Sequence, residues 1–129
     1  MKKIMVVEDE RDVVELLKFI LEKDGYSVTP AYNGREAMEL MGLMTSEQPK
    51  VMPDLMILDI MMPEVDGYTL QNKMMVTEET KSIPIIILTA KGQMRDLFGM
   101  ASNVAAYIEK PFDPQLLRVK VKEIVAKMS

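Results

Sequence analysis

Residues 55–67 of the chain read LMILDIMMPEVDG. The stretch begins with a continuous apolar run, which is typical of a strand that is buried on both faces of a parallel sheet. The run ends in the carboxylate of Asp59. Because open α/β sheets place their chemistry at the carboxyl ends of their strands, Asp59 is a candidate reactive group.

Short apolar runs alternate with amphipathic helical stretches along the chain, which is the pattern of a parallel sheet covered by helices. Five strand–helix repeats fit the length of 129 residues, and this length predicts a single domain. We expect strands within 1–7 and at 27–32, 55–58, 85–88 and 105–108, and helices at about 12–24, 34–43, 67–76, 93–101 and from 114 onward. The sequence therefore predicts an α/β fold, a doubly wound (βα)5 arrangement.

Local signals mark several helix ends. Gly25 supplies a stop after the first helix. Asn33, with Glu36 three residues later, resembles a capping box for the second helix. Asp113 followed by Pro114 combines an N-cap residue with proline at the first helical position, so it predicts the start of the last helix.

Apolar residues also recur at helical spacing. We expect the first helix to bury one face, made of Val13, Leu16, Leu17, Ile20 and Leu21. We expect the last helix to bury Leu117, Val121, Ile124, Val125 and Met128. Pro30 cannot donate a ladder hydrogen bond, so the second strand belongs on a sheet edge, as it does in a sheet of order 2-1-3-4-5.

Composition excludes several function classes. The chain has no histidine, so any phosphohistidine chemistry must come from a partner, and it has no cysteine, which suits a cytoplasmic protein. A net charge of −4 and a pI near 4.9 argue against direct nucleic-acid binding. No apolar stretch approaches the ~20 residues that a membrane span needs.

Polar residues follow four of the expected strands. If the strands are parallel and the crossovers right-handed, Glu8, Asp9, Asp59, Thr89 and Lys110 converge at one rim of the sheet. Three carboxylates at close range repel one another unless cations lie among them. Lys110 is one such cation, and hard oxygen ligands without histidine or cysteine favour Mg²⁺ or Mn²⁺ as the other.

This set of groups suits phosphoryl transfer. With a divalent ion neutralising the site, the carboxylate of Asp59 can attack phosphorus and form an aspartyl phosphate. The ion and Lys110 would balance the charge on the transferring group, and the hydroxyl of Thr89 and nearby backbone N–H groups would donate to its oxygens.

At this point the residues match a known family. The chain resembles a response-regulator receiver domain, the two-component signalling module with the flavodoxin-like fold of CheY and strand order 2-1-3-4-5. The matching motifs are VEDE at 7–10, LDIMMP at 58–63 with DG at 66–67, LTA at 88–90 and KPF at 110–112. They extend from end to end of the chain, so we expect a stand-alone receiver over 1–129 with no effector domain.

The resemblance implies a role for each residue of the metal site. Asp59 would be the phosphoacceptor and a metal ligand. Asp9 would bind Mg²⁺ directly, Glu8 would bind it through water, and Met61 would offer its backbone carbonyl.

The resemblance also implies how the phosphoryl group is held and sensed. Thr89 and the backbone amide of Ala90 would bind phosphoryl oxygens, and Lys110 would pair with one of them. Lys110-Pro111 is expected to be a cis peptide. Tyr107 matches the family's switch aromatic, which moves inward when Thr89 is drawn to the phosphoryl group.

The expected partners follow from these roles. A sensor histidine kinase or a phosphotransfer protein would supply the phosphoryl group, and an unknown downstream protein would dock on the face formed by the fourth helix, fifth strand and fifth helix (the α4-β5-α5 face of the family). The chain would be a monomer or a weak phosphorylation-dependent dimer. It would be no enzyme beyond catalysing its own phosphorylation and dephosphorylation.

Two features depart from the family pattern. Many DNA-binding members carry Gly-Ala-Asp-Asp-Tyr entering the fifth strand, whereas residues 103–107 here read NVAAY. The loss of both acidic residues argues against the charged dimer interface of those regulators. The segment 42–53 also looks longer than usual, and we assign it no role.

One alternative stays open, and two others are disfavoured. The chain is also compatible with the receiver part of a longer DNA-binding transcriptional regulator. An aspartyl-nucleophile phosphatase is disfavoured, because Met61 stands where such enzymes carry a general acid. A flavin-binding domain of the same topology is disfavoured because residues 8–10, EDE, would repel a phosphate.

Overall fold

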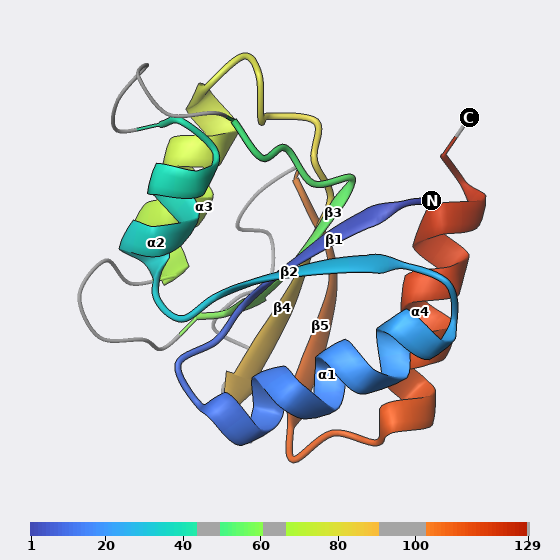
Figure 1. Ribbon diagram of the computed structural model, residues 1–129. Helices are drawn as coiled ribbons and strands as arrows, with labels where there is room; N and C mark the ends of the chain where they lie inside the picture. Colours follow the sequence, from blue (N-terminus) through green and yellow to red (C-terminus); the bar gives the residue numbers. More distant parts are fainter. Residues whose placement is uncertain (44–49, 61–66, 91–102, 129) are drawn as a thin grey trace.

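The computed structural model describes residues 1–43, 50–60, 67–90 and 103–128, with the backbone alone described at 67, 68 and 90 (Figure 1). Within these ranges the elements are β1 (Lys3–Val7), α1 (Arg11–Lys23), β2 (Ser27–Ala31), α2 (Gly34–Leu40), β3 (Leu55–Asp59), α3 (Gly67–Val76), β4 (Ile85–Ala90), β5 (Val104–Lys110) and α4 (Pro114–Ala126). The predicted strands and four of the predicted helices are present. The expected helix at 93–101 lies outside the described residues, so α4 is the last predicted helix.

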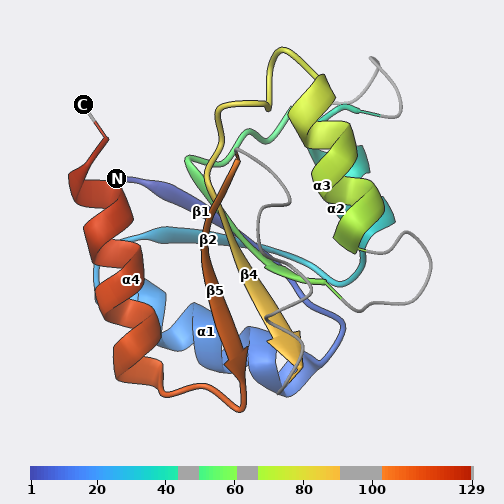
Figure 2. The same ribbon diagram turned by 180° about the vertical axis from the view of Figure 1, so that it is seen from behind.

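All the described strands pair in parallel, in the order β2-β1-β3-β4-β5. Figure 2 shows β4 and β5 side by side and pointing the same way. The predicted doubly wound α/β fold and its strand order are therefore confirmed. Pro30 lies on the edge strand β2, opposite Val6 of β1. This position is the expected one, because an edge strand does not need the donor that proline lacks.

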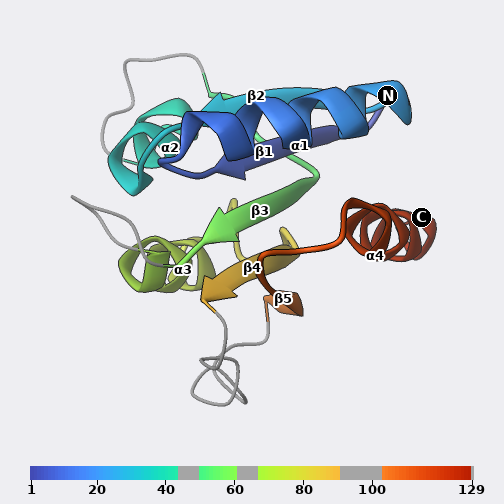
Figure 3. The ribbon, with the colours of Figure 1, turned by 90° about the horizontal axis from the view of Figure 1, so that it is seen from below.

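A hydrophobic core lies on each face of the sheet, because successive side chains of a strand point to opposite faces. Figure 3 shows α1 and α4 on one side of the sheet and α2 and α3 on the other. On the α2–α3 side the strands contribute Met5, Val7, Met56, Leu58, Ile85 and Ile87. On the α1–α4 side they contribute Ile4, Val6, Leu55, Ile57, Ile86, Leu88 and Ile108.

Helix α1 buries the predicted face except at Leu16: Leu17 and Leu21 are in the core, and Val13 and Ile20 are partly buried against it. Its fully buried residues are Val14, Leu17 and Leu21, whereas Leu16 is 41% exposed. Each residue turns an α-helix by about 100°, so Leu16 lies a quarter turn or more from Leu17 and outside the contact with the sheet. The helix ends as expected at Gly25, which has φ +92°. Its last carbonyls accept backbone N–H groups in a Schellman arrangement.

The caps of the other helices are largely as predicted. Asn33 Oδ1 accepts the N–H of Glu36 at 2.8 Å, but the Glu36 carboxylate accepts the N–H of Tyr32 and not that of Asn33. Half of the expected capping box is therefore present. Helix α2 ends at Leu40, earlier than predicted, and Gly42 follows with φ +76°. Asp113 caps α4 by accepting the N–H of Gln115.

The last helix is tied to the first by a forked ion pair. Arg118 donates from Nε to Asp24 Oδ2 at 2.8 Å and from Nη2 to Asp24 Oδ1 at 2.7 Å. The hydrogen bonds from Arg118 hold the pKa of Asp24 below its usual value of 3.8. None of the described helices combines the length and apolar character that a membrane-spanning segment requires.

We expect Arg118→Gln to lower the free energy of unfolding at neutral pH, because Asp24 loses both donors. A carboxyl whose pKa is depressed on folding stabilises the fold above its unfolded pKa of 3.8, and this contribution is lost as the pH falls through the folded pKa. The difference in the free energy of unfolding between variant and wild type, measured by urea unfolding, should therefore become smaller only at acidic pH. Arg118→Lys keeps the positive charge but lacks the two parallel donors of the guanidinium. Its free energy of unfolding should lie between those of wild type and Arg118→Gln. A difference that grows towards acid would contradict this prediction.

Candidate functional site

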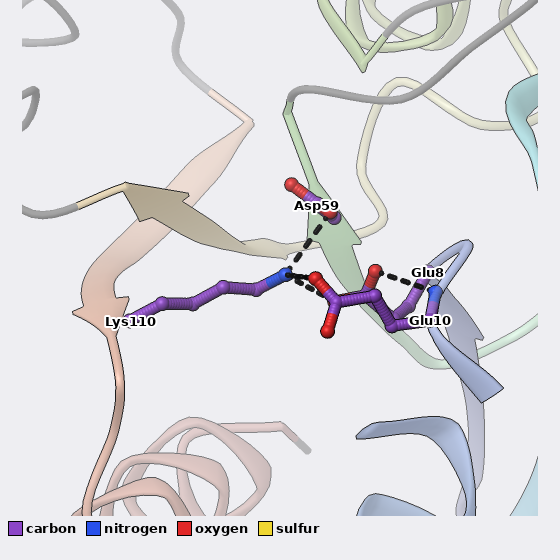
Figure 4. A network of polar contacts seen from close by, with 4 residues as sticks. All are labelled: Glu8, Glu10, Asp59 and Lys110. Carbon is purple, nitrogen blue, oxygen red and sulfur yellow. Dashed lines mark hydrogen bonds and ion pairs between the residues drawn. The ribbon is translucent and has the colours of Figure 1, made fainter. Parts of the chain in front are cut away.

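The polar residues predicted to converge lie at the carboxyl edge of the sheet. Glu8 follows β1 directly, Asp59 is the last residue of β3, and Lys110 is the last residue of β5. Because β4 lies between β3 and β5, the side chain of Lys110 crosses the end of β4 to reach the acidic residues, as Figure 4 shows.

Lys110 binds three carboxylates at once (Figure 4). Its Nζ lies 2.5 Å from Glu8 Oε1, 3.1 Å from Asp59 Oδ2 and 3.8 Å from Glu10 Oε1. The second oxygen of Glu8, Oε2, accepts the backbone N–H of Glu10 at 3.1 Å. The Glu8 side chain is fully buried, whereas the Glu10 side chain is 65% exposed. Glu8 therefore depends on Lys110 and Glu10 for its hydrogen bonds, while Glu10 also meets solvent.

The burial of Glu8 sets the electrostatics of the site. Burial raises the pKa of Glu8 to about 7, although the hydrogen bonds from Lys110 and the N–H of Glu10 pull the pKa down. Partial burial alone would lower the pKa of Lys110, but the bond to Glu8 and the charges of Asp59 and Glu8 outweigh it and raise the pKa. Lys110 therefore stays protonated throughout the physiological range.

The acidic residues fit a hard divalent cation. Glu8, Asp9 and Asp59 each offer a carboxylate oxygen, and these three oxygens lie within 4.8 Å of one another. Such an all-oxygen set, partly open to solvent at Asp9, suits Mg²⁺ or Mn²⁺, which keep several water ligands. The predicted carbonyl ligand, Met61, lies outside the described residues.

The family model described as the response regulator receiver domain matches residues 4–122. The chain belongs to the response-regulator receiver family. The curated response regulator SaeR of Staphylococcus epidermidis is 38% identical over all of this chain and 52% of its own length. SaeR of Staphylococcus aureus is 34% identical over 99% of this chain and 52% of its own length. The receiver thus spans about half the length of these relatives.

Solved structures show the same fold. A putative response regulator from Chloroflexus aurantiacus is 34% identical and has a TM-score of 0.81, with 98% of each chain covered. The response regulator TrrA from Thermotoga maritima, solved in complex with Mg(2+)-BeF, is 34% identical and has a TM-score of 0.76, with 96% of this chain and 99% of that chain covered. The receiver is therefore a signalling domain of two-component systems.

The residues proposed to sense the phosphoryl group share one face of the receiver sheet. Thr89 is fully buried near the end of β4 and lies two residues after Ile87, so both side chains point to the α2–α3 side. Tyr107 is opposite Ile87 in the parallel register and packs against the same core. Thr89 and Tyr107 are therefore diagonal neighbours on the α2–α3 face of the sheet.

The structure brings together most of the predicted site residues. Glu8, Asp9, Asp59 and Lys110 form one cluster, Thr89 lies at the same edge, and Lys110-Pro111 is a cis peptide as expected. The side chain of Ala90 is not described.

Sequence reasoning predicted Lys110 among the carboxylates, but it did not predict which carboxylate lies nearest, nor the approach of Glu10. The available signal was the acidic run at 8–10, which places a third carboxylate beside the two expected ligands.

We expect the stability of the metal-free receiver to fall with rising pH, because Glu8 must ionise in a buried site. A carboxyl whose pKa rises on folding from 4.5 to about 7 destabilises the fold progressively across that window. The loss should be of order 1–3 kcal/mol. Urea unfolding in EDTA across this range should show the loss in wild type and not in Glu8→Gln, which cannot ionise.

Glu15→Gln is the matched control, since it removes the same charge from an exposed position of α1. It should retain the wild-type pH dependence. The same slope in Glu8→Gln would show that another group is responsible.

Proposed function

We propose that the receiver accepts a phosphoryl group on Asp59 from the phosphohistidine of a sensor kinase or phosphotransfer protein, in a Mg²⁺-dependent reaction. The observation that carries this proposal is the contact of Lys110 Nζ with Asp59 Oδ2 at 3.1 Å, beside the carboxylates of Glu8 and Asp9. A nucleophilic carboxylate, a fixed cation and a divalent-ion site are the groups that phosphoryl transfer needs.

In the proposed step a carboxylate oxygen of Asp59 attacks phosphorus. The bond between phosphorus and the imidazole nitrogen of the donor breaks, and its electron pair returns to the imidazole. Mg²⁺ held by Asp9, Asp59 and, through water, Glu8 would neutralise negative charge on the phosphoryl oxygens. Lys110 is already at the acceptor, so it can pair with a phosphoryl oxygen with little reorganisation.

The lysine changes partners in this scheme. In the structure its ammonium group stabilises the carboxylates of Glu8 and Asp59. Once a phosphoryl group is attached to Asp59, the added charge of about −1.5 to −2 makes that group the strongest anion within reach of Lys110. Thr89 and the amide of Ala90 would bind further phosphoryl oxygens. The receiver itself then contributes positioning and charge, and it also hydrolyses the aspartyl phosphate.

We propose that Thr89 passes the signal to Tyr107. When Thr89 is drawn towards the phosphoryl group, it vacates space on the α2–α3 side of the sheet for its diagonal neighbour. Inward movement of the Tyr107 ring would reshape the face that includes β5 and α4, where a downstream protein would dock. We expect this exchange to take place in the cytoplasm, as the absence of cysteine favours.

A second candidate function is supported by the lengths of the relatives. The SaeR proteins are about twice as long as this chain, with 52% of each covered. The receiver would then be the input part of a longer DNA-binding regulator, and its docking face would act on an attached domain. Sequencing the gene past the codon for Ser129 distinguishes this candidate from a stand-alone receiver.

We expect incubation with acetyl phosphate and Mg²⁺ to add one phosphoryl group, about 80 Da, to the wild-type receiver. Intact-mass spectrometry should show this species in wild type and its absence in Asp59→Asn, which lacks the nucleophile. Asp54→Asn is the matched control, because Asp54 lies at the opposite end of β3 and accepts the N–H of Lys3. No added mass in wild type, or an undiminished one in Asp59→Asn, would refute the proposal.

We expect Lys110→Met to slow phosphorylation by roughly tenfold to a hundredfold, because the transferring group loses its fixed counter-cation. Phosphorylation by acetyl phosphate, followed over time by intact mass, measures the rate. Lys120→Met, which removes the same charge from a surface ion pair on α4, should phosphorylate at the wild-type rate. Equal slowing in both variants would mean that net charge, and not Lys110, is responsible.

A further inference from the structure

Arg11 lies over an aromatic ring although its neighbours are acidic. Its guanidinium carbon is 4.5 Å from the centroid of the Tyr32 ring. Carboxylates stand at residues 8, 9, 10, 12 and 15 of the same loop and helix. In the part of the chain that the structure describes, Arg11 forms no ion pair with any of them. The arginine is therefore directed away from the charges that would attract it most.

The acidic edge is within reach of Arg11. It is the first residue of α1 and stands two residues after Asp9, so their Cα atoms are at most about 7.6 Å apart. An extended arginine side chain spans that length. A guanidinium binds carboxylates through a rigid fork of donors, and it does not lose its charge. An Arg11 that paired with Asp9 would compete with a divalent cation for the same oxygens.

Tyr32 is well placed to prevent this pairing. It directly follows β2, and the loops after β1 and β2 are joined by the bond from the Glu8 N–H to the Ala31 carbonyl at 3.0 Å. The ring is half-buried and packs against the core on the α1–α4 side. The backbone N–H of Tyr32 donates to Glu36 at 3.3 Å. The ring is thus held against this core, directly after the edge strand β2.

We propose that Tyr32 is a positioning residue for metal binding, because it holds the guanidinium of Arg11 away from the carboxylate of Asp9 in the cluster of Glu8, Asp9 and Asp59. This inference rests on the proposed function, since it assumes that these carboxylates bind a divalent cation. Tyr32 touches neither the metal nor the reacting atoms, and it acts only through Arg11.

The two positions of Arg11 are close in energy. A cation–π contact at a partly exposed site and an exposed ion pair are of similar strength. Removal of the ring should therefore shift Arg11 towards Asp9 and weaken metal binding by about twofold to fivefold. Removal of the arginine should abolish the effect of the ring.

Titration with Mn²⁺, whose free ion gives an EPR signal that falls on binding, measures the affinity without phosphorylation. Tyr32→Leu should bind Mn²⁺ about twofold to fivefold more weakly than wild type. Tyr32→Phe is the matched control, because it keeps the ring and should bind as wild type does. In an Arg11→Gln background, Tyr32→Leu should cause no further loss.

The outcomes separate the two proposals. Failure of the wild type to bind Mn²⁺ would refute the metal site itself. Binding by wild type with an equal affinity in Tyr32→Leu would refute only the role of Tyr32. An equal loss with and without Arg11 would mean that Tyr32 acts through loop packing, which also overturns the inference. Circular dichroism confirms folding of each variant, and Tyr32→Met replaces Tyr32→Leu if the latter unfolds.

Discussion

Glu8 and Asp59 are carboxylates buried at the ends of adjacent parallel strands, and like charges at this separation need a cation between them. In the structure that cation is the ammonium group of Lys110, which comes from β5, two positions from β3 and three positions from β1 in the sheet. The ion pair joins residues 102 positions apart in the chain. The carboxyl edge therefore acquires its charge balance only when β1, β3 and β5 have all assembled, so the site and the fold are completed together.

The same constraint explains why a metal ion suits this edge. Lys110 satisfies one oxygen of Glu8 and one of Asp59, and Asp9 faces solvent. A second cation that entered beside Asp9 would relieve the remaining repulsion without displacing the sheet. It would also allow Lys110 to leave Glu8 and pair with a negatively charged group attached to Asp59. In the proposed function, the binding of an ion, the acceptance of a phosphoryl group and the position of Lys110 would therefore depend on one another through the charges at this edge.

Much of the fold and of the site could be predicted from the sequence, because both follow from short-range patterns. The apolar run before Asp59 and the Asp113-Pro114 start signal correspond to observed elements. The exposure of Leu16 and the full burial of Val14 could not be predicted, since neighbouring apolar residues look alike in the sequence and only packing against the sheet selects among them. The same holds for the contact of Arg11 with Tyr32. From the sequence alone, Arg11 is expected to pair with a nearby carboxylate. The position of the Tyr32 ring depends on how β2 lies against β1, which the sequence does not give.

Pro30 has a consequence for how copies of this protein can meet. A sheet has two edges, and a chain that adds strands at both can grow without limit into a fibre. On the β2 edge the nitrogen of Pro30 offers no donor to an incoming strand, so extension from that side is disfavoured. Association through β5 from both copies would not meet this obstacle. Such a contact uses the same surface twice and closes at two molecules, so the proline favours pairs of molecules over fibres in any edge-to-edge assembly.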